Sequence, residues 1–589
     1  MTAGTALEAS GLRGTVEARE IADVLPALEE VAQAARQGLW AVGMVGYEAA
    51  PAFDPALEVV GVPAGATPLV WFGLFERLQP VPPVAGPAAP PVSAGPEVWD
   101  RELDERQFTG AVKLIHDEIA AGNTYQVNLT TRLRRGYGGS LSGAGRAMYQ
   151  QLTSAQRGAY SAYLETDEWA VACGSPELFF SLADGRLTTR PMKGTALRGR
   201  FPSEDSERSA SLTLSSKERA ENVMIVDLMR NDFGRVAEIG TVAVPALYQV
   251  ERYPTVWQMT STVECELRPE VTLGDLFGAV FPPGSVTGAP KASTMSLIAA
   301  LERSPRGPYC GAIGYVGPEV MRFAVGIRTA VLDRRSSAVE FGVGSGITWS
   351  AQPAAEWREL AAKASVLWRD PPPSELIETL AYTATDGLRN LDGHVRRMMA
   401  SAEYYGWPCD ENEMRSMLAA TTASREGALR VRVRLSAGGR LSVEATPLDA
   451  PAQAPVRLEL DDEPVDSSDP KLFHKTGDRH HLDRRLARHP GADDVVLVNE
   501  RGELTETCRA NLALEISGQW LTPALTCGCL PGVERQRLLD AGQLTEAVLR
   551  VPVLDHASGL AVVSSLRGWR PAVLGDHRNA PASSPPPRQ

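Results

Sequence analysis

Two proline-rich stretches divide this 589-residue chain and limit how its parts can fold. The first, QPVPPVAGPAAPPVSAGP at residues 79–96, cannot form a helix or a central strand, because proline fixes φ and lacks an amide donor, so it is expected to be a stiff connector. The second, DPPP at residues 370–373, follows a helical pattern and predicts a domain boundary. The expected parts are an N-terminal part at 1–78, a main domain at 97–369, a second domain at 370–575 and a disordered tail at 576–589.

Charge and cysteine content exclude several classes of function. The net charge of −13 would repel the phosphates of a nucleic acid or an anionic membrane, so neither is expected as a partner. The seven cysteines form no CxxC pair and no disulfide framework, which suits a reducing compartment. No basic segment followed by an apolar run opens the sequence, and no run of about 18 apolar residues follows. We therefore expect a soluble, cytoplasmic protein.

Histidines are almost absent from the first part of the chain. His116 is the only one before residue 370, and its predicted helix places Phe108, Val112 and Ile115 on one apolar side. His116 is therefore expected to be a surface or structural residue. Acid and base chemistry in this part would fall to carboxylates, lysines or water.

Two predicted helices carry pairs of glutamates three residues apart. SKERAENVMIVDLMRND, with a serine cap, contains Glu218 and Glu221, and AAEWRELAAKA contains Glu356 and Glu359. Such pairs on two helices can hold a hard divalent cation such as Mg²⁺. The alternative is that each pair belongs to a solvated helix face.

Other segments of the first part indicate a pocket for a small dicarboxylate. In TYQVNLTTRLR, apolar and polar residues alternate as in a half-buried strand, with Gln126 on the polar face. FPPGSVTGAPKAST predicts a turn followed by the start of a helix beside Lys291. RFAVGIRTAVL is predicted to be one strand with Arg322 and Arg328 on the same face. FGVGSGITWS lets the backbone approach a ligand closely.

Taken in order, these motifs resemble the chorismate-utilising enzymes, which include anthranilate, aminodeoxychorismate, isochorismate and salicylate synthases. The resemblance covers about residues 46–367 and rests on GSPELFF, RPMKGT, SKERAENVMIVDLMRND, FPPGSVTGAPKAS, YCGAIGY, FAVGIRT and the second glutamate helix. It implies an α/β (α+β) fold in which large, mostly antiparallel sheets are flanked by helices.

The resemblance also implies roles for individual residues. Glu177 of GSPE would be the general acid, with a pKa raised by burial. Glu221 and Glu359 would bind Mg²⁺, supported by Glu218 and Glu356. The residues implied to bind the substrate, chorismate, or to line its pocket are Gln126, Thr195, Thr287, Lys291, Tyr315, Arg328, Gly344, Gly346 and Lys363.

Two positions distinguish between the branches of this family. Members that add water to C2 of chorismate place a lysine where this chain has Gln126, and anthranilate synthases place a small residue where this chain has Lys193. A lysine in PxKGT resembles aminodeoxychorismate synthase, in which it would attack C2 as an uncharged amine. Gln258 departs from the family, in which a histidine often occupies that position.

The second part of the chain resembles fold-type IV pyridoxal phosphate enzymes, which have two subdomains. The pattern begins with a strand and a helix near Leu391, which are followed by KLFHKTGDRHHLDRR. It continues with a hairpin that contains LTET and ends with a proline and a glycine just before the start of a helix. HKTGDRHH alone would indicate a basic surface patch. The resemblance implies that Lys475 forms the Schiff base with pyridoxal 5'-phosphate and that Glu506 faces its ring nitrogen. Arg397 and the backbone of Val533 and Glu534 would hold its phosphate, whereas Ser564 departs from the usual asparagine.

Fusion of the two parts favours one combined function. Aminodeoxychorismate made by the first part would lose pyruvate in a lyase reaction of the second, which gives 4-aminobenzoate. The alternatives are an anthranilate synthase-like first part, an amino acid aminotransferase as the second part, or a non-catalytic scaffold. No GxCxG-type glutaminase motif is present, so a separate glutamine amidotransferase partner is expected, and the lyase domain is a candidate for homodimer formation.

Overall fold

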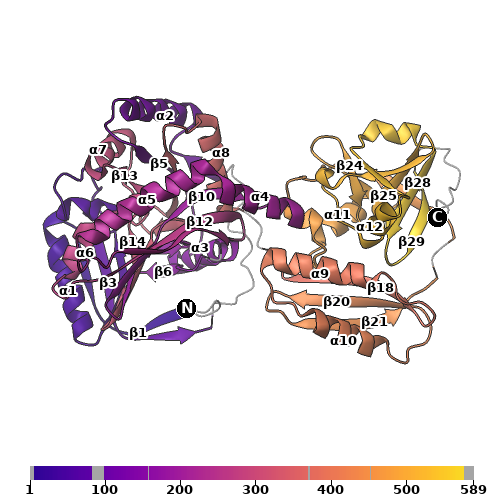
Figure 1. The fold of residues 1–589 in the computed structure, drawn as a ribbon, viewed down its shortest axis with the longest axis horizontal. Coiled ribbons are helices and arrows are strands. Elements are labelled where there is room, and N and C mark those ends of the chain that lie inside the picture. Colours follow the sequence, from indigo (N-terminus) through magenta and orange to yellow (C-terminus); the bar gives the residue numbers. More distant parts are fainter. Residues whose placement is uncertain (1–5, 83–97, 157, 369–371, 451–452, 576–589) are drawn as a thin grey trace. The chain divides into compact units, whose positions relative to one another are not determined.

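The computed structural model describes residues 6–82, 98–156, 158–368, 372–450 and 453–575, which form two compact units. Within these ranges, the first unit contains the chain up to Arg198 and again from Arg208, and the second contains Gly199–Glu207 and the chain from Pro372. Figure 1 shows both units and labels many of their elements. Each unit has its own sheets and its own hydrophobic clusters, so each is described separately.

The first sheet of the first unit is antiparallel throughout its described ladders. Its strands follow the order β1 (Ala6–Ala18), β3 (Val70–Val81), β2 (Trp40–Val45), β14 (Ala312–Val316), β15 (Val320–Val325), β8 (Leu178–Ala183), β9 (Arg186–Arg190), β12 (Val256–Glu266) and β10 (Met192–Leu197), and β11 (Ala243–Arg252) pairs with β12.

A second antiparallel sheet completes the strand framework of this unit. Its order is β13 (Gly288–Ala289), β5 (Gln126–Gly136), β17 (Ala338–Ile347), β16 (Thr329–Asp333), β7 (Trp169–Cys173) and β6 (Ala162–Glu165), and β4 (Asp100–Arg101) pairs with β5. β5 and β17 pair over a long register, from Gly136 opposite Ala338 to Val127 opposite Ile347. Because both strands are buried along most of their length, this pairing fixes their polar residues in place.

Helices cover the sheets of the first unit with their apolar sides. They are α1 (Val24–Arg36), α2 (Glu105–Ala120), α3 (Leu141–Gln156), α5 (Ser216–Gly234), α6 (Leu273–Val280), α7 (Lys291–Leu301) and α8 (Pro353–Ala364). A further helix, α4 (Pro202–Leu214), begins in the segment Gly199–Glu207 that belongs to the second unit. α5 lies against β10 and β12 (Figure 1). Ser215 caps it by accepting a hydrogen bond from Glu218 N, as the predicted serine cap requires.

The second unit contains two further sheets. A four-stranded antiparallel sheet follows the order β19 (Gly387–Leu388), β18 (Glu375–Thr383), β20 (Leu429–Ser436) and β21 (Leu441–Pro447). A mixed sheet follows the order β24 (Leu504–Thr507), β23 (Asp494–Val498), β22 (Val456–Leu460), β29 (Gly568–Leu574), β28 (Gly559–Ser564), β25 (Asn511–Ile516), β26 (Gln519–Pro523) and β27 (Thr545–Ala547).

Helices α9 (Leu391–Tyr405) and α10 (Glu411–Thr422) pack on the four-stranded sheet, and α11 (His480–Arg488) and α12 (Val533–Asp540) pack on the mixed sheet. α9 and α12 approach each other closely, because a Cβ on Gly393 would lie 2.5 Å from Val533 Cγ1. Glycine at this position therefore brings the start of α9 against the start of α12.

The predicted fold class is confirmed: mixed α/β, with large antiparallel sheets in the first unit. The prediction of one strand over RFAVGIRTAVL is wrong, since β15 ends at Val325 and β16 of the other sheet begins at Thr329. A Cβ on Gly326 would lie 2.1 Å from Pro308 O, and Arg328 has a φ of +52°. The chain therefore turns here, and Arg322 and Arg328 do not share a strand face.

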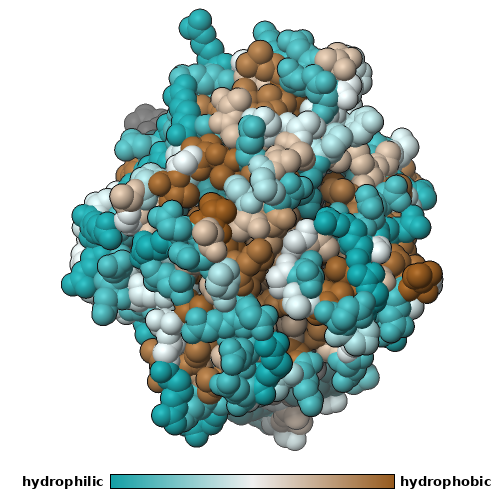
Figure 2. Space-filling model, turned by 90° about the vertical axis from the view of Figure 1, so that its left-hand side faces the viewer, coloured by the Kyte–Doolittle hydropathy of each residue, from teal (hydrophilic) through white to brown (hydrophobic). Residues whose placement is uncertain are grey.

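Parts of the expected connector and tail lie outside the described residues. β3 continues through Gln79 to Val81, while residues 83–97 and the expected tail at 576–589 are not described. Among the described helices, none has the length and apolar character needed to cross a membrane. Figure 2 shows one face of the first unit, where hydrophobic residues are interspersed among hydrophilic ones.

Candidate functional site

A cavity of about 190 Å³ lies in the first unit and is lined by strands of both of its sheets. β10 and β12 contribute from one sheet, and β5 and β17 contribute from the other. Helices α5 and α8 and the segments that contain Glu177, Tyr309 and Arg328 also contribute to the lining. The charged side chains that line it are Glu177, Lys193, Lys217, Glu218, Glu221, Arg328, Glu356, Glu359 and Lys363.

Lys193 lines this cavity from an irregular position in β10. The register of β10 against β12 shifts here, and Gly194 has a φ of +95°, a conformation that favours glycine. Asn222 Nδ2 donates to Lys193 O at 3.1 Å, and Gln258 Nε2 donates to Gly194 O at 2.8 Å. Gln258, which departs from the family, thus holds the backbone that presents Lys193.

The surroundings of Lys193 favour its uncharged amine. Burial lowers the pKa of Lys193, and the positive charge of Lys363 lowers it further. The carboxylates of Glu221, Glu177 and Glu359 oppose this shift but do not cancel it. An amine with a lowered pKa is available as a nucleophile at a lower pH than an ordinary lysine.

Glu177 has the opposite shift, because it is a buried acid. Burial raises the pKa of Glu177 to about 7, against the opposing effects of a hydrogen bond to Ser285 and the charge of Lys193. Its backbone N–H donates to Ser175 Oγ at 3.2 Å, which fixes the GSPE turn. A carboxyl group of this kind can hold a proton near neutral pH and deliver it to a leaving group.

The two glutamate pairs meet in the cavity. The pKa of Glu218 is raised by burial and then by Glu221, and the pKa of Glu356 is raised chiefly by burial. Glu359 Oε1 lies 2.6 Å from Lys363 Nζ, and Glu356 accepts a hydrogen bond from Ser345 Oγ.

These carboxylates fit a magnesium ion that keeps several waters. Within the described residues, no three of the four glutamates bring their oxygens within 4.8 Å of one another. Mg²⁺ usually takes only one or two carboxylates directly, so an all-protein cage is not required. Burial raises the pKa values of Glu218 and Glu356, and a divalent cation beside them would favour their charged forms, whereas Lys363 already lowers the pKa of Glu359.

Five of the predicted substrate-binding residues line the cavity: Thr195, Arg328, Gly344, Gly346 and Lys363. Thr195 Oγ1 donates to Gln258 Oε1 at 2.9 Å, and Lys363 Nζ donates to Gly344 O at 2.9 Å. Burial lowers the pKa of Arg328 to about 10. This group places two cations, Arg328 and Lys363, in the wall of the cavity, where they could bind a carboxylate.

Gln126 lies immediately behind this lining. A Cβ on Gly346 would lie 2.7 Å from Lys193 Nζ and 3.3 Å from Gln126 Nε2, so all three residues adjoin. Gln126 is 1% exposed, and within the described structure neither polar atom of its side chain has a hydrogen-bond partner. A buried amide without a partner indicates a place for water or a ligand.

Three other predicted residues are not part of the cavity lining: Thr287, Lys291 and Tyr315. Thr287 Oγ1 donates to Pro283 O at 3.1 Å, and Lys291 Nζ lies 3.4 Å from Asp232 Oδ2. Tyr315 lies on β14, where its ring centroid is 6.0 Å from that of Trp40. These contacts hold the three side chains to neighbouring elements of the fold.

Tyr309 lines the cavity but was not among the predicted residues. Its ring packs so closely on β17 that a Cβ on Gly342 would lie 2.3 Å from Tyr309 Cδ1. Tyr309 opens the YCGAIGY motif, in which only the last tyrosine, Tyr315, was predicted to belong to the site. The glycines of FGVGSGITWS were the available signal, since alternate glycines in a strand indicate close packing by a ring or a ligand.

A second cavity, of about 590 Å³, lies in the second unit. Its lining includes the five residues predicted to bind a cofactor: Lys475, Glu506, Arg397, Val533 and Glu534. Arginines contribute much of its charge: Arg430, Arg432, Arg479, Arg509, Arg567 and Arg570 also line it. The cavity therefore suits anionic groups.

Lys475 and Glu506 have shifted pKa values for the same physical reason. Burial, followed by the charge of Arg397, lowers the pKa of Lys475 to about 8. Burial raises the pKa of Glu506 to about 8, although its carboxylate accepts from Leu530 N at 3.1 Å. A protonated ring nitrogen beside Glu506 would restore its charged form, so this carboxylate fits a pyridinium partner.

The start of α12 offers backbone donors to an anion. Gly532 is its N-cap and makes no side-chain capping hydrogen bond, so the first amide groups of α12 remain available beside the cavity. Arg397 Nη1 donates to Pro531 O at 3.1 Å, just before this helix. The arrangement fits a phosphate group.

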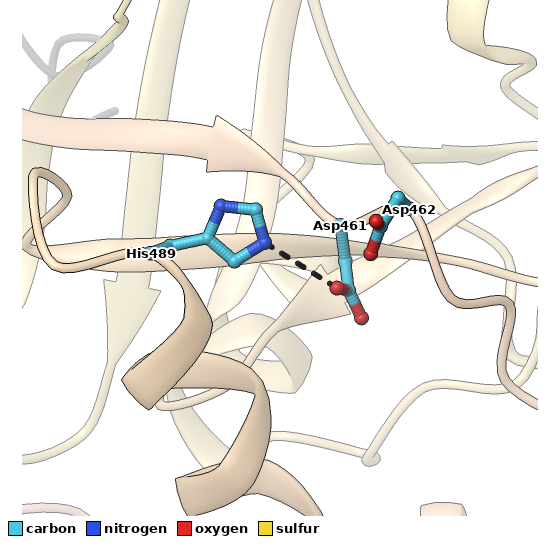
Figure 3. A group of neighbouring side chains, drawn as sticks. All are labelled: Asp461, Asp462 and His489. Atoms are coloured by element: carbon cyan, nitrogen blue, oxygen red, sulfur yellow. Dashed lines mark ion pairs between the residues drawn. The ribbon is translucent and has the colours of Figure 1, made fainter.

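Asp461, Asp462 and His489 form a separate cluster, shown in Figure 3. His489 Nε2 lies 3.4 Å from Asp461 Oδ1. Asp461 is also paired with Arg485 and with Arg488. Two arginines thus neutralise the carboxylate that a cation would need, and the cluster joins α11 to the end of β22.

Comparison with known proteins identifies relatives of both units. Residues 5–369 match the chorismate binding enzyme family, and residues 375–574 match amino-transferase class IV. The chain is 38% identical over 265 residues to aminodeoxychorismate synthase component 1 of Escherichia coli (strain K12), which covers 44% of this chain and 56% of that protein. It therefore spans about half the length of this relative.

Two other relatives extend the comparison. Anthranilate synthase component 1 of Aeropyrum pernix is 36% identical over 333 residues, which covers 56% of this chain and 74% of that protein. The crystal structure of anthranilate synthase component I from Streptococcus pneumoniae TIGR4 matches with a TM-score of 0.53 and 23% identity, covering 63% of this chain and 93% of that one. This structural match concerns the fold alone.

Proposed function

Because the chain belongs to the chorismate binding enzyme family and carries a class IV amino-transferase domain, we propose that it makes 4-aminobenzoate in two steps. In the first, chorismate and ammonia give 4-amino-4-deoxychorismate and water. In the second, that product loses pyruvate. The observation that carries the first step is the position of Lys193, which lines one cavity with Glu177 and the four glutamates.

In the proposed first step, Lys193 and Glu177 act together. The uncharged Lys193 amine forms a bond to C2 of chorismate, both conjugated double bonds of the ring shift, and the C4–O bond breaks. Glu177 gives its proton to the departing hydroxyl, which leaves as water. Ammonia then bonds to C4, the bond between C2 and Lys193 breaks, and the excess proton returns to Glu177. The opposite pKa shifts of the two residues support these roles.

Other residues of the first cavity hold the substrate. We assign Glu221 and Glu359 as the direct magnesium ligands, with Glu218 and Glu356 supporting them through waters. Bound magnesium would supply positive charge to a substrate carboxylate. Arg328 supports binding of a second carboxylate, because its buried guanidinium lines the same cavity.

Gln126 supports amination rather than the addition of water to C2. The position that holds a lysine in water-adding relatives is a neutral amide in this chain, and its polar atoms lie beside Lys193. An amide cannot act as the base that activates water. The amine beside Gln126 is that of Lys193, which is proposed to bond to C2 itself.

In the second unit, we assign Lys475 as the residue that holds pyridoxal 5'-phosphate covalently and moves protons. The cofactor supplies an electron sink when it is bound. Glu506 would keep its ring nitrogen protonated, and Arg397 with the amides of Val533 and Glu534 would hold its phosphate. The arginine-rich lining supports an anionic substrate such as aminodeoxychorismate.

We propose that ammonia comes from a separate glutamine amidotransferase subunit, since one relative of the chain is named component 1 of its enzyme. Fusion of the two units would supply the second with its substrate at high local concentration. Homodimer formation through the second unit is also proposed.

The test supplies the purified chain with chorismate, Mg²⁺, an ammonium salt and pyridoxal 5'-phosphate, and measures the products by chromatography. The proposal expects 4-aminobenzoate and pyruvate. Lys193→Ala should stop the reaction at chorismate, and Lys475→Ala should stop it at aminodeoxychorismate. Anthranilate as the product would overturn the first assignment, and transamination without pyruvate release would overturn the second.

A further inference from the structure

A chain of three buried side chains lies in the wall of the second cavity. His394, on the first turn of α9, is 1% exposed. Its Nδ1 lies 2.6 Å from Glu378 Oε2, and its Nε2 lies 2.7 Å from Ser565 Oγ. His394 and Ser565 both line the cavity. The hydrogen-bond direction along this chain determines what Ser565 can offer to a ligand.

Glu378 is fixed as a carboxylate. Arg397 donates to it twice, from Nε to Oε1 at 2.8 Å and from Nη2 to Oε2 at 2.7 Å. Burial alone would raise the pKa of Glu378, but Arg397 and His394 hold it well below its ordinary value. A carboxylate only accepts hydrogen bonds, so the Nδ1 atom of His394 must carry the hydrogen.

It follows that the Nε2 atom of a neutral His394 carries no hydrogen, so this atom can only accept a hydrogen bond. Ser565 has one hydroxyl proton, and the 2.7 Å contact directs it to this nitrogen. Asn390 Nδ2 donates to the same Ser565 oxygen at 3.1 Å. In this state Ser565 has no proton left for the cavity and cannot donate to an anion.

Charged groups from several elements face His394. Burial lowers its pKa, Glu378 of β18 raises it, and Arg397 of α9 and Lys475 lower it, so that the pKa is lowered overall. Glu534 of α12 is linked to Ser565 through Asn390, whose Nδ2 donates to Glu534 Oε2 at 2.7 Å. This link also places Ser565 beside the start of α12, where the phosphate is proposed to bind.

We propose that His394 is a positioning residue that sets the hydrogen-bond direction of Ser565, so that phosphate binding in this cavity takes up one proton. Protonation of Nε2 turns His394 into a donor to the Ser565 oxygen. The Ser565 proton is then released toward the cavity, where it can be donated to a phosphate oxygen. The proton comes from solvent, and no covalent bond changes. This inference rests on the proposed cofactor of the second unit.

The test uses pyridoxine 5'-phosphate, which has the phosphate but no aldehyde to react with Lys475. Calorimetric titration of the whole chain at pH 7.5, in buffers of different ionisation enthalpy, gives the number of protons taken up. At this pH the phosphate itself is mostly a dianion, since its second pKa is about 6. We expect close to one proton for the wild type, and an affinity that falls up to about tenfold per pH unit as pH rises.

Variants and controls separate this coupling from a general effect of charge. His394→Gln, which cannot titrate, should bind pyridoxine 5'-phosphate with no proton uptake, and Ser565→Ala should take up much less than one proton. His489→Gln, which changes a histidine outside the cavity lining, should keep the wild-type value. Pyridoxine without phosphate should bind with no uptake.

Nitrogen-15 NMR of the histidine side chains provides a direct readout. We expect His394 to have one protonated nitrogen in the free protein and two in the complex. Binding of pyridoxine 5'-phosphate without proton uptake, or full uptake by Ser565→Ala, would overturn this inference alone. Failure of pyridoxine 5'-phosphate to bind would overturn the cofactor assignment together with it.

Discussion

The amine of Lys193 lies against the backbone of Gly346, so closely that a Cβ on that glycine would be 2.7 Å from Lys193 Nζ. The two residues come from different sheets, β10 and β17. Their contact is therefore a result of how the two sheets face each other across the cavity. It also makes the position of the amine sensitive to a single methyl group.

Gly346→Ala is expected to displace Lys193 and to lower the rate of aminodeoxychorismate formation by about 10²-fold, because a shift of about 1 Å at a reacting atom has an effect of that size. Product formation with ammonium salt measures it. Gly136→Ala on β5 is the matched control, since the nearest atom to a Cβ there is 3.8 Å away. Equal rates for the two variants would contradict the close contact.

The pH dependence of the first step should follow Glu177. Its pKa is raised to about 7, and the proposed role needs the protonated form. The contribution of Glu177 to the rate should therefore be largest below pH 7. Above pH 7 it should fall about tenfold for each pH unit, because the protonated fraction of Glu177 falls by that factor. Glu177→Gln should lose the rate and this pH dependence together, while its circular dichroism stays that of the wild type. A rate that rises through pH 8 would rule out the acid role.

Substitutions on the two faces of α5 should differ in their effect on the magnesium dependence of the reaction. Glu221→Gln is expected to raise the magnesium concentration for half-maximal activity at least tenfold, because a charged oxygen ligand is lost. Asp227→Asn changes a carboxylate of the same helix that is 73% exposed and paired with Arg230, and it should change nothing. Chelation with EDTA should stop the wild-type reaction, and added Mg²⁺ should restore it.

The buried ion pair of Arg306 and Glu302 holds the backbone of two residues that line the first cavity. Arg306 donates to Glu302, to Val286 O and to Asn128 O, and the last two residues line the cavity. Arg306→Met leaves the Glu302 carboxylate buried with reduced compensation, which costs about 3–5 kcal/mol. Hydrogen exchange of β5 should report this loss, while β20 in the second unit serves as the internal control.

A double variant tests whether that cost comes from the unpaired charge. Arg306→Met combined with Glu302→Met removes both charges and should recover a large part of the lost protection of β5. If the double variant exchanges as fast as the single one, the main contribution of Arg306 is its donation to the two backbone carbonyls.

The side of a helix on which a residue lies could be predicted, because it depends only on the spacing of residues along the sequence. Glu218 and Glu221, like Glu356 and Glu359, lie three residues apart and therefore share a helix side wherever the helix packs. The turn at Gly532 before α12 could be predicted for the same reason. By contrast, RFAVGIRTAVL was predicted to be one strand, and only the close approach of Gly326 to Pro308 O shows why the chain turns there.

The sequence alone determined which chemical groups are present and on which local elements they lie, since side-chain periodicity depends only on neighbouring residues. Only the tertiary structure decided which of them meet. Tyr309 lines the cavity and Tyr315 does not, although both belong to YCGAIGY, and Lys291 pairs with Asp232 instead of reaching the cavity. The reason is that strand register and sheet packing depend on long-range contacts, which a local pattern does not contain.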